Sequence, residues 1–393
     1  MIRHEFLGRE AVLDILDKSR QADKLGQPFL LVGPDGSGKE TTALEFARRL
    51  NCVGGEACTA DRRCESCVKA LSHQHPDIHW IGPAPAAIKE AEVRHLLDAK
   101  MENPFFQPAY AGTAQISIGD PEHPGPLSIR SIIHFLRRRA FQSAYKVAIV
   151  SDGQRLNAAA ANAFLKTLEE PPPQTVILLL ANSTDGMLPT IISRCRKVLV
   201  DPWTEDELTR ILVDMYGADP DAAARSARTA DGSARRAIAL LEEGAQALVD
   251  WAGRLFEWIH AGDRAEASIA ADELHRGLFS HTLDVGKPGK DNAGDDTLAS
   301  KRGRAIQLCE MLNLHYSDAV RCLELQDDWI PRLAQARDLV ARAAARRTTG
   351  ALLQDMESIE DARLEIDRNL NIGLVMAVLF EGLIDNVERE PVR

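Results

Sequence analysis

The sequence has no long apolar run and no excess of positive charge. No stretch reaches the roughly 18 uninterrupted apolar residues of a membrane-spanning helix, and the first residues, Met-Ile-Arg-His-Glu-Phe-Leu, lack the apolar core of a signal peptide. Asp and Glu outnumber Lys and Arg by 58 to 47, which gives a net charge of -11, so any contact with DNA needs a local basic face. We therefore expect a cytoplasmic protein with no membrane partner.

Cysteine is present in a pattern that indicates a metal site rather than disulfides. The 393 residues, 45% hydrophobic and 27% charged, are typical of a globular protein of two or three domains. In a reducing compartment, seven cysteines favour metal binding or burial. Four soft ligands within one short stretch complete a tetrahedral zinc site with no open position, so the predicted zinc is structural. These ligands are Cys52, Cys58, Cys64 and Cys67.

The stretch from Gly33 to Thr41, Gly-Pro-Asp-Gly-Ser-Gly-Lys-Glu-Thr, predicts a phosphate-binding loop. It follows the apolar run 28–32, which we expect to be a buried strand, and precedes residues 42–50, whose apolar spacing is helical. A phosphate loop requires this context, because backbone amides beside a helix N-terminus bind phosphate and a lysine reaches the terminal phosphates. ATP or ADP is the expected ligand. The residues expected to bind it are Gly33, Gly36, Gly38, Lys39 and Thr41.

The two residues that would hold magnesium beside this loop are both missing. A hydroxyl should follow the lysine, but Glu40 stands there, and Thr41 lies about 100° further round the helix. A second buried strand, expected at 146–150, should end in an acidic metal ligand, but it is followed by Ser151. The paired loss predicts that metal-dependent hydrolysis is not the task of this chain.

The next motifs are ordered and specific. Residues 156–172 predict a helix ended by prolines, a third strand follows at 175–180, and residues 188–195 read Leu-Pro-Thr-Ile-Ile-Ser-Arg-Cys. With the loop and the cysteines, these residues resemble the clamp-loader branch of the AAA+ proteins. Within that branch they are similar to delta-prime subunits of the bacterial replicative DNA polymerase III. The resemblance extends over residues 1–241.

The resemblance implies roles for two arginines. Arg194 matches the arginine of the family's Ser-Arg-Cys motif, which reaches the ATP held by a neighbouring subunit. A guanidinium suits this role because it is always charged and bridges phosphate oxygens. An internal salt bridge is the alternative interpretation of Arg194. Arg235 matches the second nucleotide-sensing position, facing the chain's own nucleotide, and Asn182 matches the first.

The resemblance and the apolar spacing together predict an α/β protein with a helical C-terminal part. The parallel sheet with flanking helices is expected to carry the zinc-binding insertion at 52–67. We expect a proline-broken connection over 102–127 and a mobile loop at 277–296. The predicted domains are an AAA+ phosphate-loop domain over 1–202, a helical lid over 203–244 and an all-helical collar, for oligomerisation, over 245–393.

The function that the resemblance implies is that of a largely non-hydrolysing subunit of the polymerase holoenzyme, without polymerase activity of its own. Its expected partners are gamma/tau and delta subunits, and through the complex the sliding clamp and primed DNA during DNA replication. Two alternatives remain open. Lys39 and Arg235 also suit an active ATPase of the gamma/tau type. A zinc-stabilised DNA-binding module would need a basic face, which the composition does not indicate.

Overall fold

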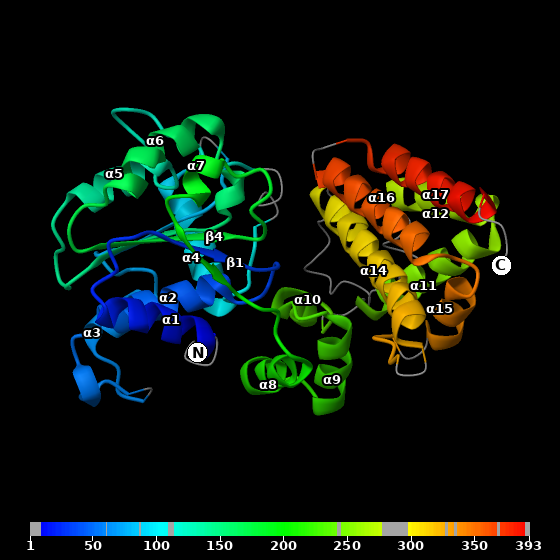
Figure 1. The fold of residues 1–393 in the computed structure, drawn as a ribbon, viewed down its shortest axis with the longest axis horizontal. Coiled ribbons are helices and arrows are strands. Elements are labelled where there is room, and N and C mark those ends of the chain that lie inside the picture. Colours follow the sequence, from blue (N-terminus) through cyan, green and yellow to red (C-terminus); the bar gives the residue numbers. More distant parts are fainter. Residues whose placement is uncertain are drawn as a thin grey trace, which may run out of the picture. The chain divides into compact units, whose positions relative to one another are not determined.

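The structure, a computed structural model, describes residues 9–59, 61–85, 88–108, 114–241, 245–276, 298–326, 329–333, 336–367 and 370–389. The chain forms two compact units, Met1–Ala237 and Ile238–Arg393, which are described separately (Figure 1). The lid predicted over 203–244 groups with the first unit as far as Ala237, and the three-domain division stays a prediction. The loop expected at 277–296 lies outside the described residues. Within these ranges no helix is both long and apolar enough to cross a membrane.

The first unit is built on a five-stranded sheet in which every neighbouring pair is parallel. The strand order is β2-β3-β4-β1-β5. Val32, the last residue of β1, pairs with Ala181 on one side and Leu199 on the other. The carboxyl ends of the strands therefore meet at one edge, where ligands bind in sheets of this kind. The strands are β1 (Phe29–Val32), β2 (Ile78–Ile81), β3 (Lys146–Val150), β4 (Thr175–Ala181) and β5 (Arg196–Leu199).

Helices cover both faces of this sheet (Figure 1). Successive strand residues point to opposite faces, and a strand covered on both faces reads as a continuous apolar run. Leu30 accordingly packs in one core and Leu31 in the other. The first core includes residues of α4 (Glu90–Glu102), α5 (Ile129–Arg137), α6 (Ala158–Glu169) and α7 (Pro189–Ile192), and the second includes residues of α1 (Glu10–Gln21) and α2 (Lys39–Leu50).

The three predicted strands are confirmed as β1, β3 and β4. The strands β2 and β5 were not predicted, because both lie at edges of the sheet and neither is a continuous apolar run. In β5, three of the four residues are exposed. A short, half-polar edge strand has no periodicity by which it can be told from a loop.

Three short helices follow the sheet: α8 (Glu205–Tyr216), α9 (Pro220–Thr229) and α10 (Ala234–Ala239). The first begins with a reciprocal cap in which Thr204 and Glu207 each accept from the other's backbone N–H. It ends at Gly217, whose φ of +65° few other residues adopt readily. Asp219 then caps the next helix, with proline at its first position. Local sequence signals thus define the two longer helices.

The second unit is entirely helical in its described residues. Asn371 accepts a hydrogen bond from the backbone N–H of Leu374 at 3.0 Å and begins the last helix. The expected helical C-terminal part is confirmed in the described residues, where α16 and α17 are separate helices. The helices are α11 (Ala245–Ala261), α12 (Arg264–Arg276), α14 (Leu298–Leu325), α15 (Arg337–Ala344), α16 (Thr349–Asp367) and α17 (Ile372–Arg389).

Candidate nucleotide site and cysteine cluster

The glycine loop connects β1 to α2 and packs against residues that lie just before α8 and α10. Gly36 and Gly38 have φ values of +73° and +86°, in the left-handed region that favours glycine. A Cβ on Gly38 would lie 2.6 Å from the ring of Trp203, and one on Gly36 would clash with the Ser233 hydroxyl. The two glycines are required by both conformation and contact.

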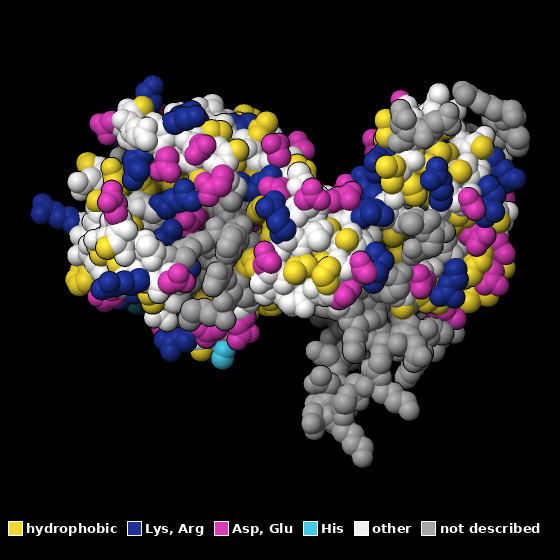
Figure 2. Space-filling view, turned by 90° about the horizontal axis from the view of Figure 1, so that it is seen from below, with side chains coloured by type: hydrophobic (Ala, Val, Ile, Leu, Met, Phe, Trp, Pro, Cys, Tyr) yellow, Lys and Arg dark blue, Asp and Glu magenta, His cyan; other side chains and the backbone are white. Residues whose placement is uncertain are grey.

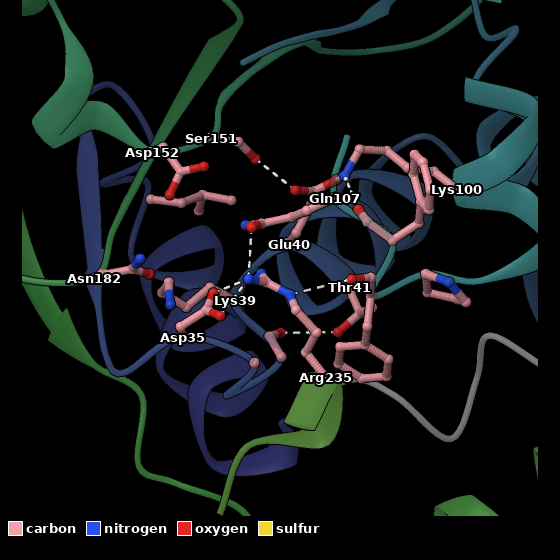
Figure 3. Close-up of a pocket in the computed structure, with 16 residues that line it drawn as sticks. Asp35, Lys39, Glu40, Thr41, Lys100, Gln107, Ser151, Asp152, Asn182 and Arg235 are labelled. Atoms are coloured by element: carbon pink, nitrogen blue, oxygen red, sulfur yellow. Dashed lines mark hydrogen bonds and ion pairs between the residues drawn. The ribbon is translucent and has the colours of Figure 1, made fainter. Parts of the chain in front are cut away.

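A pocket opens beside this loop at the carboxyl edge of the sheet (Figure 3). Its free volume is about 50 Å³, whereas small-molecule sites usually measure roughly 300–1,000 Å³. The pocket is therefore largely filled by its own side chains. Its lining includes Asp35, Gly36, Gly38, Lys39, Glu40, Thr41, Lys100, Gln107, Ser151, Asp152, Asn182 and Arg235.

Lys39 is turned back into the loop. Its Nζ donates to the carbonyl oxygens of Gly33 and Pro34, each at 2.7 Å. Burial lowers the pKa of this amine to about 8, although the carboxylates of Asp35 and Asp152 act in the opposite direction. The lysine is thus positioned for a phosphate, but two of its three donors are engaged by the loop itself.

Arg235 crosses from α10 to the same pocket. Its guanidinium pairs with Asp35 of the glycine loop, donates to Gln107 Oε1 at 2.5 Å and donates to the carbonyl oxygen of Phe105 at 3.3 Å. An arginine held there can contact a nucleotide phosphate only if it leaves Asp35. The positive charge of the expected second sensor is balanced within the chain.

Glu40 and Ser151, which stand where magnesium ligands were expected, are bonded to each other. Ser151 Oγ donates to Glu40 Oε2 at 2.7 Å, and Lys100 Nζ lies 2.8 Å from Glu40 Oε1. Burial alone would raise the pKa of Glu40, but the Lys100 ammonium and hydrogen bonds from Lys100 and Ser151 outweigh it and lower the pKa below its usual value. Both carboxylate oxygens are engaged, so these residues do not fit a magnesium ion, which requires octahedral oxygen ligands.

Most of the predicted nucleotide residues meet in this pocket. Gly36, Gly38, Lys39, Thr41 and Arg235 line it, as does Asn182. Gly33 is not in the lining, but its carbonyl oxygen accepts a hydrogen bond from the Lys39 amine.

Lys100, a second buried cation of the pocket, was not predicted from the sequence. Its side chain is 6% exposed, and it lies on the face of α4 that also buries Val93 and Leu96. The spacing of these three residues is helical, so the apolar stripe of the helix was the available signal.

Arg194 lies apart from the pocket, after α7. Its guanidinium pairs with Glu169 Oε2 at 3.2 Å and donates to the carbonyl oxygen of Thr190 at 2.9 Å. The Arg194 side chain is 30% exposed and that of Glu169 is 60% exposed. The internal salt bridge that was the alternative interpretation of Arg194 is therefore present, and it is a surface pair.

The four predicted cysteines converge. All four sulfur atoms lie within 4.8 Å of one another, with Cys52 and Cys64 Sγ 3.9 Å apart and Cys58 and Cys67 Sγ 3.6 Å apart. Zinc–sulfur bonds of about 2.3 Å in a tetrahedron imply sulfur separations of about 3.8 Å. The donor set and its spacing fit a zinc ion.

Neighbouring donors favour an ionised sulfur at Cys64. Burial opposes ionisation of Cys64, but backbone N–H groups of Cys67 and Val53 donate to its sulfur, and its pKa falls to about 6. Arg48 Nη1 donates to Cys67 Sγ at 3.2 Å. Such outer contacts orient and stabilise metal ligands.

Comparison with known proteins identifies the family of the N-terminal part. The family model described as "DNA polymerase III, delta subunit" matches residues 8–118 and 126–204. The chain is 28% identical over 193 residues to DNA polymerase III subunit delta' of Bacillus subtilis (strain 168), which covers 49% of this chain and 47% of the relative. The chain is 32% identical over 175 residues to the delta' subunit of Haemophilus influenzae, a match that covers 44% of this chain and 42% of the relative.

A gamma/tau subunit is also similar. That of Mycobacterium bovis is 29% identical over 248 residues, which cover 61% of this chain and 36% of the relative. The chain thus spans about half the length, or less, of these relatives. Since the matches converge on one set of replication proteins, residues 8–118 and 126–204 of this chain belong to the clamp-loader family of DNA polymerase III subunits.

Proposed function

We propose that this chain is a delta-prime-type AAA+ subunit of a bacterial clamp loader. It does not hydrolyse ATP efficiently itself, and it supplies Arg194 to the ATP bound by an adjacent gamma/tau subunit. With that subunit and a delta subunit it helps to place the sliding clamp on primed DNA in the cytoplasm. The observation that carries the proposal is the 2.7 Å hydrogen bond between Ser151 and Glu40, at the two positions from which magnesium would be held.

The surface position of Arg194 supports its role as a finger. Exposed ion pairs contribute roughly 0–1 kcal/mol, so the pair with Glu169 can be exchanged for phosphate oxygens at little cost. A guanidinium that reaches a neighbour's triphosphate stabilises the charge that develops during transfer and raises turnover by about 10³–10⁵-fold. Both requirements, exposure and weak internal pairing, are met by Arg194.

The four cysteines are proposed to hold a structural zinc ion. Each sulfur would be one ligand, and a closed tetrahedron leaves no position for a substrate. The ion would stabilise the loop between α2 and α3 (Glu65–Leu71).

ATP turnover tests this function. We would measure turnover by the full chain alone with magnesium, and by the chain mixed with its gamma/tau partner, as wild type and as Arg194→Ala. The matched control is Arg196→Ala, since Arg196 is also exposed but donates to Ser19 of its own chain at 2.7 Å. We expect no turnover by the chain alone, and a loss of partner turnover of at least about 10³-fold with Arg194→Ala only. Unchanged partner turnover with Arg194→Ala would refute the finger role.

An active ATPase of the gamma/tau type is the second candidate. It is favoured by Lys39 and Arg235 in the pocket and by the similarity to gamma/tau subunits. Turnover by the chain alone that is abolished by Lys39→Ala would establish it and reject the first proposal.

A DNA-binding module is the weaker alternative. On the face shown in Figure 2, the described basic and acidic side chains are interspersed. Binding to DNA through phosphate contacts would show a steep dependence on salt.

A further inference from the structure

The carboxylate of Glu40 is held by two side chains, Lys100 and Ser151, and Ser151 is held in turn by Trp80. Lys100 comes from α4, Ser151 follows β3, and Trp80, in β2, donates from Nε1 to Ser151 Oγ at 3.1 Å. The Ser151 hydroxyl donates a hydrogen bond to one oxygen of Glu40, and the Lys100 ammonium pairs with the other. The chain of donors ends at the carboxylate, with no oxygen left unpaired.

The Lys100 ammonium is itself fully surrounded. Besides Glu40, it donates to the carbonyl oxygen of Phe106 at 3.2 Å, and it lies 5.0 Å from the centre of the Trp80 ring, whose face attracts cations. A buried ammonium is tolerated only when it is paired in this way. Lys100 is therefore an integral, buried part of the pocket and not a surface lysine at its rim.

The charges of the pocket cancel without any ion. Three cationic side chains face three carboxylates, so the lining is formally neutral. Burial and the nearby Asp35 carboxylate raise the pKa of Asp152 above its usual value. The cations are Lys39, Lys100 and Arg235, and the carboxylates are Asp35, Glu40 and Asp152.

We propose that Lys100 is a resident substitute for the divalent cation: its ammonium neutralises Glu40, closes the metal position together with Ser151, and keeps magnesium out. The pocket then holds its shape in the absence of metal. The inference rests on one half of the proposed function, that the chain itself has no metal-dependent turnover, and is independent of Arg194.

Thermal unfolding of the full chain, in EDTA and in millimolar magnesium chloride, tests the substitution. The wild type should unfold at the same temperature in both. Lys100→Met leaves the partly buried Glu40 carboxylate without its cation, so the Tm of this variant in EDTA should fall by about 6 °C or more, and magnesium should restore part of the loss. The control is Lys69→Met, which removes the surface pair with Glu65 and should change neither Tm nor its response to magnesium.

A double variant keeps the test decisive if Lys100→Met does not fold. Glu40→Gln with Lys100→Met removes both charges, so it should fold and show no response to magnesium. The proposal would be overturned if the double variant did not recover the stability lost in Lys100→Met. A wild-type Tm that rises with magnesium would also overturn it.

Bound manganese, measured by electron paramagnetic resonance, provides a second readout. Ser151→Asp adds a carboxylate beside Glu40 but retains Lys100, and we expect it to bind manganese at least tenfold more weakly than the same change combined with Lys100→Met. Equal affinities would show that Lys100 does not exclude the metal. Because no turnover is measured, a wrong assignment of Arg194 leaves this result unaffected.

Discussion

The indole Nε1 of Trp203 donates a hydrogen bond to the carbonyl oxygen of Gly36 across 3.0 Å, which joins the glycine loop to a residue 167 positions later. The same carbonyl accepts from the backbone N–H of Ala234 at 3.1 Å. The Arg9 guanidinium lies 4.2 Å from the centre of the Trp203 ring. The conformation of the loop is therefore fixed partly by the segment that follows the sheet, and not by its glycines alone.

Trp203→Phe removes this donor and keeps most of the ring. Because Ala234 still donates to the Gly36 carbonyl, we expect a loss of about 1 kcal/mol in the free energy of unfolding, measured by urea denaturation of the full chain. Trp203→Ala also removes the buried ring and should lose about 3–5 kcal/mol. Equal losses for the two variants would contradict the packing role of the ring.

Cys64→Ser should release the metal from the cysteine cluster. Since serine is a poor zinc ligand and four sulfurs are needed to close the tetrahedron, we expect the zinc content measured by atomic emission to fall from stoichiometric to a minor fraction. Cys322→Ser, a change at a partly buried cysteine outside the cluster, should retain the metal. The site would be ruled out if the purified wild-type protein contained no zinc and its stability did not change with a chelator.

Much of the candidate site could be predicted because its parts are local in sequence. The glycine loop lies between one strand and one helix, and the four cysteines are close neighbours, so spacing alone identified both. The role of Lys100 depends on Glu40 and Trp80, which belong to other elements. A lysine at the end of a helix normally faces solvent. Helical spacing places Lys100 on the buried face of α4, but its position beside Glu40 follows from how three elements pack, which periodicity does not describe.

The collar prediction shows the same limit. Apolar spacing indicated a helical second unit, but spacing alone does not mark where α16 ends and α17 begins. The break depends on one side chain, Asn371, which bonds to a backbone N–H three residues on. Capping by a single polar residue is a weaker sequence signal than an apolar stripe that continues on both sides of it.

His260, in α11, is a buried base in the core of the second unit. Its Nδ1 lies 2.8 Å from the carbonyl oxygen of Phe256, and its ring is 4.1 Å from that of Phe256. The cationic groups that act on it are Arg347 and Arg346, with His315 as a second histidine. Burial, reinforced by these charges, lowers the pKa of His260 from 6.5 to about 4, although the bond to Phe256 acts in the opposite direction.

The stability of the second unit should consequently fall as the pH drops from 6.5 to about 4, because the unfolded chain takes up a proton that the folded His260 refuses. Above pH 6.5 the contribution is complete. In this window one such group gives a slope of about 1.4 kcal/mol per pH unit, and burial lowers the pKa of His315 in the same direction. We expect His260→Gln to reduce the slope of unfolding free energy against pH by up to this amount, measured by urea unfolding of the full chain. Above pH 7 the curves of the variant and the wild type should run parallel. Identical slopes below pH 6 would mean that His260 already titrates normally in the folded protein.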